Sequence, residues 1–138
     1  MRLKTAVLLI LSTALAGCEG GSAPLPSASA AREALDTALG TWKAGKPASS
    51  LLALKPAVEA VDFDWKAGKV LSDYTVGDEA PGQGVRTLSA TLTIQGGPSP
   101  KSVRYFLLGV DPVRVFRDED FQRAMNMDNA PATKKGRR

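Results

Sequence analysis

The stretch AREALDTALGTWKAG, residues 31–45, decides how the folded part of this chain is organised. Its apolar residues recur at the i, i+3, i+4, i+7 spacing that places them on one face of an α-helix. Ser29 is a suitable N-cap, and Gly45 followed by Lys46-Pro47 is a typical helix stop. The sequence therefore predicts a long amphipathic helix that begins near residue 30. Its apolar face consists of Ala31, Ala34, Leu35, Ala38, Leu39 and Trp42.

The C-terminal half of the chain shows the two-residue period of β-strands instead. Residues 85–95 (VRTLSATLTIQ) are the clearest case, because leucine, alanine and isoleucine alternate there with serine and threonine. Further strands are expected over residues 70–76, 102–108 and 113–117, separated by segments rich in glycine, proline and aspartate. Since short connections favour antiparallel pairing of consecutive strands, we expect four antiparallel strands.

Residues 48–68 show no clear period. A short helical turn through Leu51, Leu52 and Leu54 fits the first part of this region, and residues 56–61 fit a helical turn or an extended segment. Residues 62–68 fit a turn or one helical turn, capped by Asp62 or Asp64. The pentapeptide Trp-Lys-Ala-Gly-Lys occurs at 42–46 and again at 65–69. We expect each copy to end a helical turn, with Trp packed inward and Gly as the stop; duplication or a shared ligand motif is the alternative.

A helix followed by consecutive strands predicts an α+β fold in which the helix lies across the apolar face of a curved four-stranded antiparallel sheet. This order is similar to that of small cystatin-like and NTF2-like domains. The resemblance is topological, covers about residues 30–120, and carries over no functional residue. The expected core consists of Leu35, Leu39, Trp42, Leu88, Leu92, Tyr105 and Val115.

The first residues have the three parts of a secretory signal. Arg2 and Lys4 precede an apolar run over residues 6–16, which is shorter than the roughly 20 residues of a membrane-spanning helix. The run ends in Leu15-Ala16-Gly17-Cys18, which resembles the lipobox of bacterial lipoproteins. The resemblance covers residues 1–18 and implies cleavage between Gly17 and Cys18, a diacylglyceryl thioether on Cys18, and usually a further acyl chain such as palmitate on the new N-terminus.

The resemblance also implies export and attachment to the periplasmic face of the cell envelope, with the membrane as one partner through the acyl chains. Glu19 stands where an aspartate would signal inner-membrane retention in some sorting systems, so the outer membrane is slightly favoured. The alternative is an ordinary signal peptide cut after Ala28-Ser29-Ala30, which has the A-x-A form. Cys18 is the single cysteine, so the chain forms no intramolecular disulfide.

These features divide the chain into four parts. Residues 1–17 are the expected lipoprotein signal peptide, 18–30 the lipidated cysteine and a flexible tether, 31–121 a small α+β domain, and 122–138 a disordered basic tail. Loss of the two cations in the signal lowers the formal charge from +4 to +2. The tail is expected to be a solubilising end or to touch anionic headgroups, and export argues against a nucleic-acid partner.

The residue inventory excludes much catalytic chemistry. The chain has no histidine, which removes Cys-His and Ser-His-Asp catalysis and the usual zinc sites, and we expect no metal and no cofactor. Asp62 and Asp64 flank Phe63 beside Trp65, where they act either as an acid/base pair or as helix caps and solvated charges. The acidic run at 118–120 is expected to be solvated. Four aromatic residues are expected to be core or to line a ligand pocket: Trp42, Trp65, Tyr74 and Tyr105.

The sequence thus predicts a lipid-anchored cell-envelope protein with a small non-catalytic domain, which has an interaction or assembly role and an unknown envelope protein as partner. The alternative is a small-ligand-binding or weakly enzymatic cystatin/NTF2-like domain that uses Asp62 or Asp64. A deep cavity with a carboxylate at its floor would favour the alternative, and a filled core would favour the first interpretation.

Overall fold

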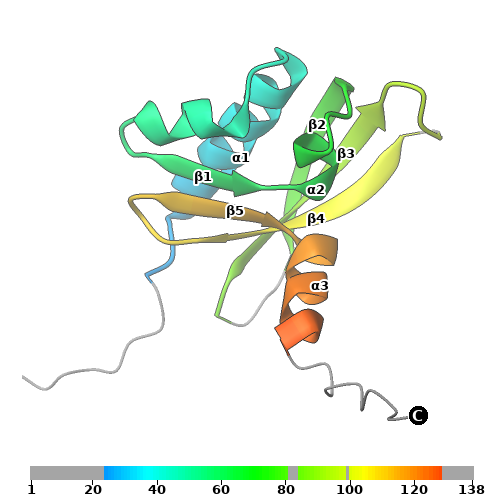
Figure 1. Cartoon of the computed structure of the whole chain (residues 1–138). Helices are drawn as coiled ribbons and strands as arrows, with labels where there is room; N and C mark the ends of the chain where they lie inside the picture. The colour runs from blue at the N-terminus through cyan, green and yellow to red at the C-terminus, as the bar shows by residue number, and fades with distance from the viewer. Residues whose placement is uncertain (1–23, 81–83, 99, 129–138) are drawn as a thin grey trace, which may run out of the picture.

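Helix α1 (Ala28–Lys43) forms where the apolar period predicted it and crosses one face of a curved sheet (Figure 1). The computed structural model describes residues 24–80, 84–98 and 100–128. The N-cap is Ser27 rather than Ser29, and its hydroxyl accepts a hydrogen bond from the Ala30 amide. At the other end Gly45 adopts φ 73°, the left-handed conformation that suits glycine after a helix. All six residues of the predicted apolar face are buried.

The sheet has five strands, so the prediction of four was wrong in number; the four predicted strands pair antiparallel as expected, and a fifth strand adds a parallel pair. The strand order is β1-β5-β4-β3-β2, and β1 runs parallel to β5 whereas the other neighbours are antiparallel. The sequence left residues 56–61 open between a helical turn and an extended segment, because four strand residues are too few to show a two-residue period. The strands are β1 (Val58–Val61), β2 (Leu71–Ala80), β3 (Arg86–Ile94), β4 (Lys101–Leu108) and β5 (Val113–Arg117).

Two short helical segments join α1 to the long strands. The 3₁₀ helix η1 (Ala48–Ala53) precedes β1, and α2 (Phe63–Lys66) follows it. The two Trp-Lys-Ala-Gly-Lys segments end α1 and α2 in the same way, with Gly45 and Gly68 both at positive φ. The positive φ of both glycines confirms the predicted helix stops, and Trp42 and Trp65 stack with their ring centroids 5.7 Å apart.

The core lies between α1 and the concave side of the sheet. Every residue of the predicted core is buried. β2 extends to Ala80, beyond the predicted end at residue 76, with a register shift between Val76 and Glu79. The extension does not alter which residues of β3 and β4 face the helix.

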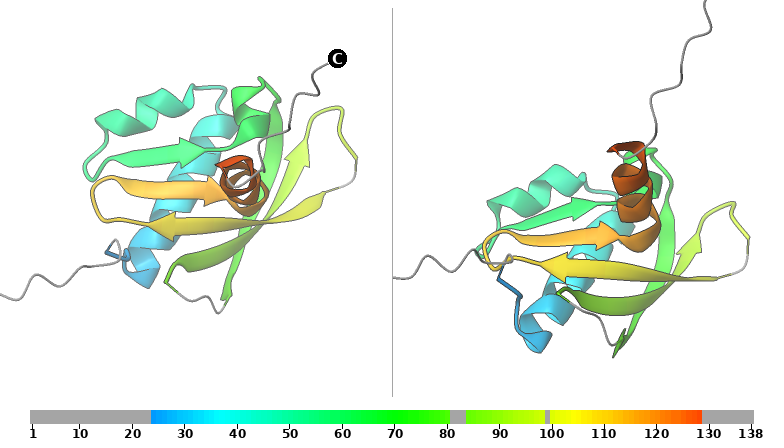
Figure 2. Two further views of the ribbon diagram at one scale, coloured as in Figure 1. Left: turned by 60° about the horizontal axis from the view of Figure 1, so that its bottom comes forward. Right: turned by 90° about the horizontal axis from the view of Figure 1, so that it is seen from below.

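Helix α3 (Asp118–Asp128) covers part of the opposite face of the sheet (Figure 2), so the prediction of a disordered tail was wrong for residues 122–128. Phe121 packs edge-on against Phe106 at 5.5 Å and also contacts Phe116 at 6.0 Å between ring centroids. These two strand residues alternate with core residues, which places α3 on the side away from α1. Residues 129–138 lie outside the described part of the chain.

The domain begins earlier than predicted, because residues 24–27 pack on it. The Gly109 amide donates to the Pro24 carbonyl at 2.7 Å, and Arg86 Nε donates to the Pro26 carbonyl. Pro26 is fully buried. Residues 24–30 therefore belong to the folded domain and not to the tether that was predicted over residues 18–30. Residues 18–23 lie outside the described part. None of the helices in the described part has the length and apolar character needed to cross a membrane.

Candidate functional site

Asp62 lies where β1 passes into α2, and it is the N-cap of that helix. Its Oδ1 accepts hydrogen bonds from the backbone amides of Asp64 at 2.9 Å and Trp65 at 3.3 Å. Short polar side chains such as aspartate satisfy the free amides at a helix start in this way. Of the two interpretations that the sequence allowed for Asp62, the structure shows the capping role.

The second oxygen of Asp62 is held by the core. The Tyr105 hydroxyl donates to Asp62 Oδ2 at 2.8 Å, and both side chains are buried. Burial raises the pKa of the Asp62 carboxyl above its ordinary value, because the hydrogen bond from Tyr105 and the charge of Arg117 only partly offset the desolvation. Burial, and then the Asp62 charge, likewise raise the pKa of Tyr105.

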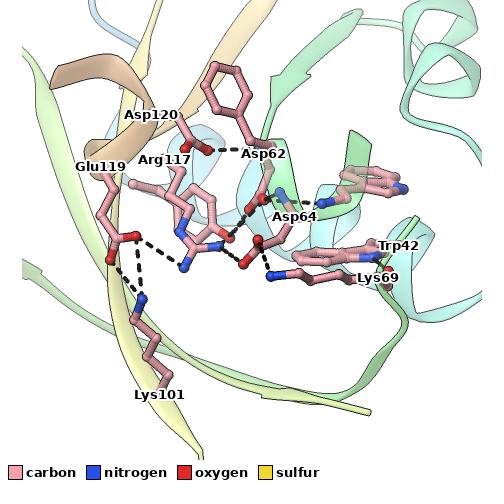
Figure 3. A network of polar contacts seen from close by, with 11 residues as sticks. Trp42, Asp62, Asp64, Lys69, Lys101, Arg117, Glu119 and Asp120 are labelled. Atoms are coloured by element: carbon pink, nitrogen blue, oxygen red, sulfur yellow. Dashed lines mark hydrogen bonds and ion pairs between the residues drawn. The ribbon is translucent and has the colours of Figure 1, made fainter. Parts of the chain in front are cut away.

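Arg117, at the end of β5, joins the acidic groups (Figure 3). Its Nη1 lies 2.8 Å from Asp64 Oδ2 and 3.5 Å from Asp62 Oδ1, and its Nη2 lies 3.5 Å from Glu119 Oε2. The Arg117 side chain is only 4% exposed. Although burial alone would lower the pKa of Arg117, the charge of Asp62 and the hydrogen bond to Asp64 raise it.

Two lysines continue this network toward solvent. Lys69 Nζ lies 2.7 Å from Asp64 Oδ1, and Lys101 Nζ lies 3.0 Å from Glu119 Oε1. Partial burial would raise the pKa of Asp64, but the hydrogen bonds from Lys69 and Arg117 outweigh it and lower the pKa below its ordinary value. Asp64 is therefore partly exposed and paired with two cations, whereas Asp62 is buried.

Asp120 shows that the prediction of a solvated acidic run was wrong at this position. The side chain is buried, and its Oδ2 accepts a hydrogen bond from the Phe63 amide at 2.9 Å. Asp62 and Asp120 thus hold successive amides at the start of α2, from β1 and α3 respectively. A four-residue helix has few contacts of its own, so these carboxylates fix its position against the sheet.

The sequence analysis predicted Asp62, Asp64 and Trp65 as candidate site residues, and the structure places them in one cluster. The sequence analysis did not predict Arg117. A usable signal was present. Val113 and Val115 face the core, and Arg117 follows them at the same two-residue spacing. A cation at an inward strand position predicts buried acidic partners, because an unpaired buried charge is costly.

Asp62 borders two spaces, a small internal void and the open groove beside α2. The void between Trp42, Trp65, Asp62 and Tyr105 measures about 10 Å³, roughly the volume that holds one water, and is too small for a substrate. Both Asp62 oxygens already accept hydrogen bonds. Within the described residues, no group of three or more acidic or cysteine side chains has a geometry suited to a metal ion. These hydrogen bonds and the ion pairs of Arg117 attach α2 to β4 and β5.

The open groove measures about 450 Å³ and lies between the start of η1, the end of β1 and α2. Trp65 forms part of its wall, and its Nε1 donates to the Lys46 carbonyl at 3.2 Å. The groove lining is mostly apolar: Pro47, Ala48, Ala60, Val61, Asp62, Phe63, Trp65 and Lys66.

No protein-family model and no curated protein matches this chain. The candidate lipidation and cleavage residues, Gly17 and Cys18, lie outside the described residues. The function of the protein is therefore inferred from its N-terminal sequence and from the geometry of its domain.

Proposed function

We propose that this protein is a lipoprotein of a bacterial cell envelope, cleaved between Gly17 and Cys18 and held at a membrane by acyl chains on Cys18. Its small α+β domain has a non-catalytic interaction or assembly role. The observation that carries the proposal is Leu15-Ala16-Gly17-Cys18 directly after a short apolar run. Two or more acyl chains hold a protein stably at a bilayer, whereas one is marginal.

The start of the domain supports cleavage at Gly17 over the alternative site after Ala30. Cleavage after Ala30 would remove Pro26, which is buried, and Ser27, which caps α1. It would also remove the first helical residues, Ala28 to Ala30. Cleavage before Cys18 leaves all of these contacts in the mature protein.

The contacts of Asp62 support the non-catalytic role. Its carboxylate caps α2 and accepts the Tyr105 hydroxyl in a filled interior, so it is engaged in holding the fold together. The domain has one long helix followed by four antiparallel strands, β2 to β5. This order supports the proposed resemblance to cystatin-like and NTF2-like domains. We place the domain at the periplasmic face, with the outer membrane slightly favoured and an envelope protein as partner.

Cell fractionation of the wild type beside Cys18→Ala tests the anchor. We expect the wild type in the membrane fraction, resistant to salt and alkaline washing and released by detergent. We expect Cys18→Ala to lose this behaviour, because the acyl chains have no attachment site. The matched control is Ser22→Ala, which changes a residue near Cys18 and leaves the motif intact. An equal membrane fraction for Cys18→Ala and the control would contradict the proposal.

A second candidate function is the binding of a small apolar ligand, which the groove beside α2 favours. Its volume of about 450 Å³ lies within the range of about 300–1,000 Å³ typical of small-molecule sites. Fluorescence titration with 1-anilinonaphthalene-8-sulfonate tests it, because Trp65 in the groove wall would transfer energy to a bound dye. Saturable binding that weakens in Ala60→Trp, which fills the groove, would support this function. Dye fluorescence that does not saturate would rule out this second function.

A further inference from the structure

Three exposed apolar side chains lie at the end of the domain where the described chain begins. They are Leu25, Leu54 and Val110, and we call this set the apolar end. The three segments that carry them lie together at the left of Figure 1, and again at the left of the left view in Figure 2. They are residues 24–27, the η1–β1 connection and the β4–β5 connection, whereas the β3–β4 connection lies at the opposite end.

Hydrogen bonds join these three segments into one surface. The Gly109 amide donates to the Pro24 carbonyl at 2.7 Å, next to Leu25 and Val110. The Ala57 amide donates to Asp111 Oδ1 at 3.0 Å, which ties the η1–β1 connection to the β4–β5 connection. A depression of about 290 Å³ lies between Leu54 and Val110. The apolar end is therefore a fixed surface of the fold.

The distance from Cys18 to this surface is short. Six residue steps separate Cys18 from Pro24, and a fully extended chain spans at most about 3.3–3.6 Å per residue. An acylated Cys18 would therefore hold Pro24 within about 20 Å of the lipid. Leu25 is the next residue, so the apolar end is the part of the domain held closest to the bilayer. This step rests on the proposed lipid anchor.

We propose that the apolar end docks on the lipid bilayer itself, with Leu25, Leu54 and Val110 inserted at the boundary between headgroups and acyl chains. Exposed apolar patches mark interaction surfaces, and apolar side chains bind in this layer of a membrane. The charged residues lining the depression are Glu33 and Lys55, which have opposite sign. Apolar contact rather than attraction to anionic lipid therefore drives the docking.

Docking fixes how the anchored domain stands on the membrane. Three side chains give only weak binding alone, but the anchor makes the contact intramolecular and raises the effective lipid concentration. α1 begins beside the apolar end, and a 16-residue helix is about 24 Å long. The C-terminal end of α1, and with it the groove beside Trp65, then points away from the bilayer toward other envelope components.

Environment-sensitive fluorophores on introduced cysteines test the proposal in the full lipidated protein. Cys18 is the only native cysteine and is consumed by lipidation, so Val110→Cys supplies the single free thiol. Val70→Cys is the matched control, because both valines are 52% exposed and Val70 lies near the other end of α1. Each protein is labelled with nitrobenzoxadiazole and reconstituted into vesicles of phosphatidylethanolamine and phosphatidylglycerol at three to one.

We expect the Val110 probe to shift its emission to the blue on reconstitution and to be quenched by nitroxide-labelled lipid, while the Val70 probe does neither. Vesicles of phosphatidylcholine alone should give the same shift, and a requirement for anionic lipid would overturn the apolar mechanism. A Val110 probe that shifts only in vesicles prepared from native envelope would overturn docking on lipid in favour of a protein partner.

Intact mass separates the failure of docking from the failure of the anchor. If the protein carries acyl chains and both probes stay in an aqueous environment, docking is wrong and the anchor stands. If the protein carries no acyl chain, the proposed function fails and the docking proposal fails with it. A second pair, Val110→Asp and Val70→Asp, repeats the comparison: only Val110→Asp should increase the protease accessibility of the 109–112 connection on vesicles.

Discussion

The Tyr105 hydroxyl donates a hydrogen bond of 2.8 Å to Asp62 Oδ2 in the interior of the domain, between β4 and the start of α2. Both partners are buried. The relationship joins a strand to a helix that is too short to hold its own position, and it engages the carboxylate that the sequence offered as a candidate acid or base.

Tyr105→Phe should lower the free energy of unfolding by about 1–3 kcal/mol, because it leaves a buried carboxylate oxygen without its donor. The control is Tyr74→Phe, whose hydroxyl donates to Asp36 at 3.0 Å at an exposed site and should cost less. Urea denaturation of both variants measures the difference. Equal losses in the free energy of unfolding would mean that the buried hydrogen bond stabilises the fold no more than the exposed one.

Arg117→Met should lower the free energy of unfolding by about 3–5 kcal/mol, because it leaves the buried Asp62 carboxyl without its cation. Arg104→Met removes a pair of similar geometry, 2.7 Å from Asp118, but the Arg104 side chain is 64% exposed. Exposed pairs of this kind contribute about 0–1 kcal/mol. The two variants are compared by denaturation in the same buffer, and a loss for Arg104→Met as large as that for Arg117→Met would contradict the assignment of Arg117.

The two aspartates should have opposite effects on stability as the pH changes. Burial raises the pKa of Asp62, so the folded protein binds the proton more tightly than the unfolded chain. The wild type should therefore gain stability relative to Asp62→Asn as the pH falls from 7 toward the ordinary value of 3.8. Asp64 has a lowered pKa, so the wild type should lose stability relative to Asp64→Asn as the pH falls below 3.8.

Denaturant midpoints of the three proteins between pH 3 and pH 7 check these signs. Each difference between wild type and variant reports the removal of one carboxyl group, because the groups outside the Arg117 network titrate alike in both proteins. A wild-type advantage over Asp62→Asn that grows with rising pH would show that the fold stabilises Asp62 as an anion, which is the opposite of a raised pKa.

Ser27→Ala should lower the free energy of unfolding by about 1 kcal/mol, the usual cost of removing an N-cap. Its hydroxyl accepts from the Ala30 amide at 3.1 Å. Ser29→Ala is the control, since Ser29 is the residue that the sequence suggested as the cap and it lies within α1. Thermal unfolding that ranks Ser29→Ala as the more damaging change would place the start of α1 two residues later than the structure does.

Periodicity explains how much of the fold was predictable. The apolar face of α1 and the positions of β2 to β5 follow from local spacing, because each element is long enough to repeat its pattern. β1 is not predictable in this way, since its four residues pair with β5 residues that lie 55 positions later in the chain. α3 is mostly polar outside Phe121, so its packing on Phe106 depends on tertiary contact rather than on its own pattern.

The candidate site was predictable only in part. Asp62, Asp64 and Trp65 are neighbours in sequence, so a local search finds them together. Arg117 and Asp120 reach them through the parallel pairing of β1 and β5, which the sequence did not reveal. These distant partners decide whether a carboxyl group is buried with a raised pKa, as Asp62 is, or paired with cations near the surface, as Asp64 is.

Intact mass spectrometry of the protein extracted from the membrane fraction is the decisive measurement for the lipid anchor. We expect a chain that lacks residues 1–17 and carries a diacylglyceryl group and a further acyl chain, with the modification mapped to a peptide that begins at Cys18. An unmodified chain that begins at Ala31, or one that retains residues 1–17, would contradict the anchor.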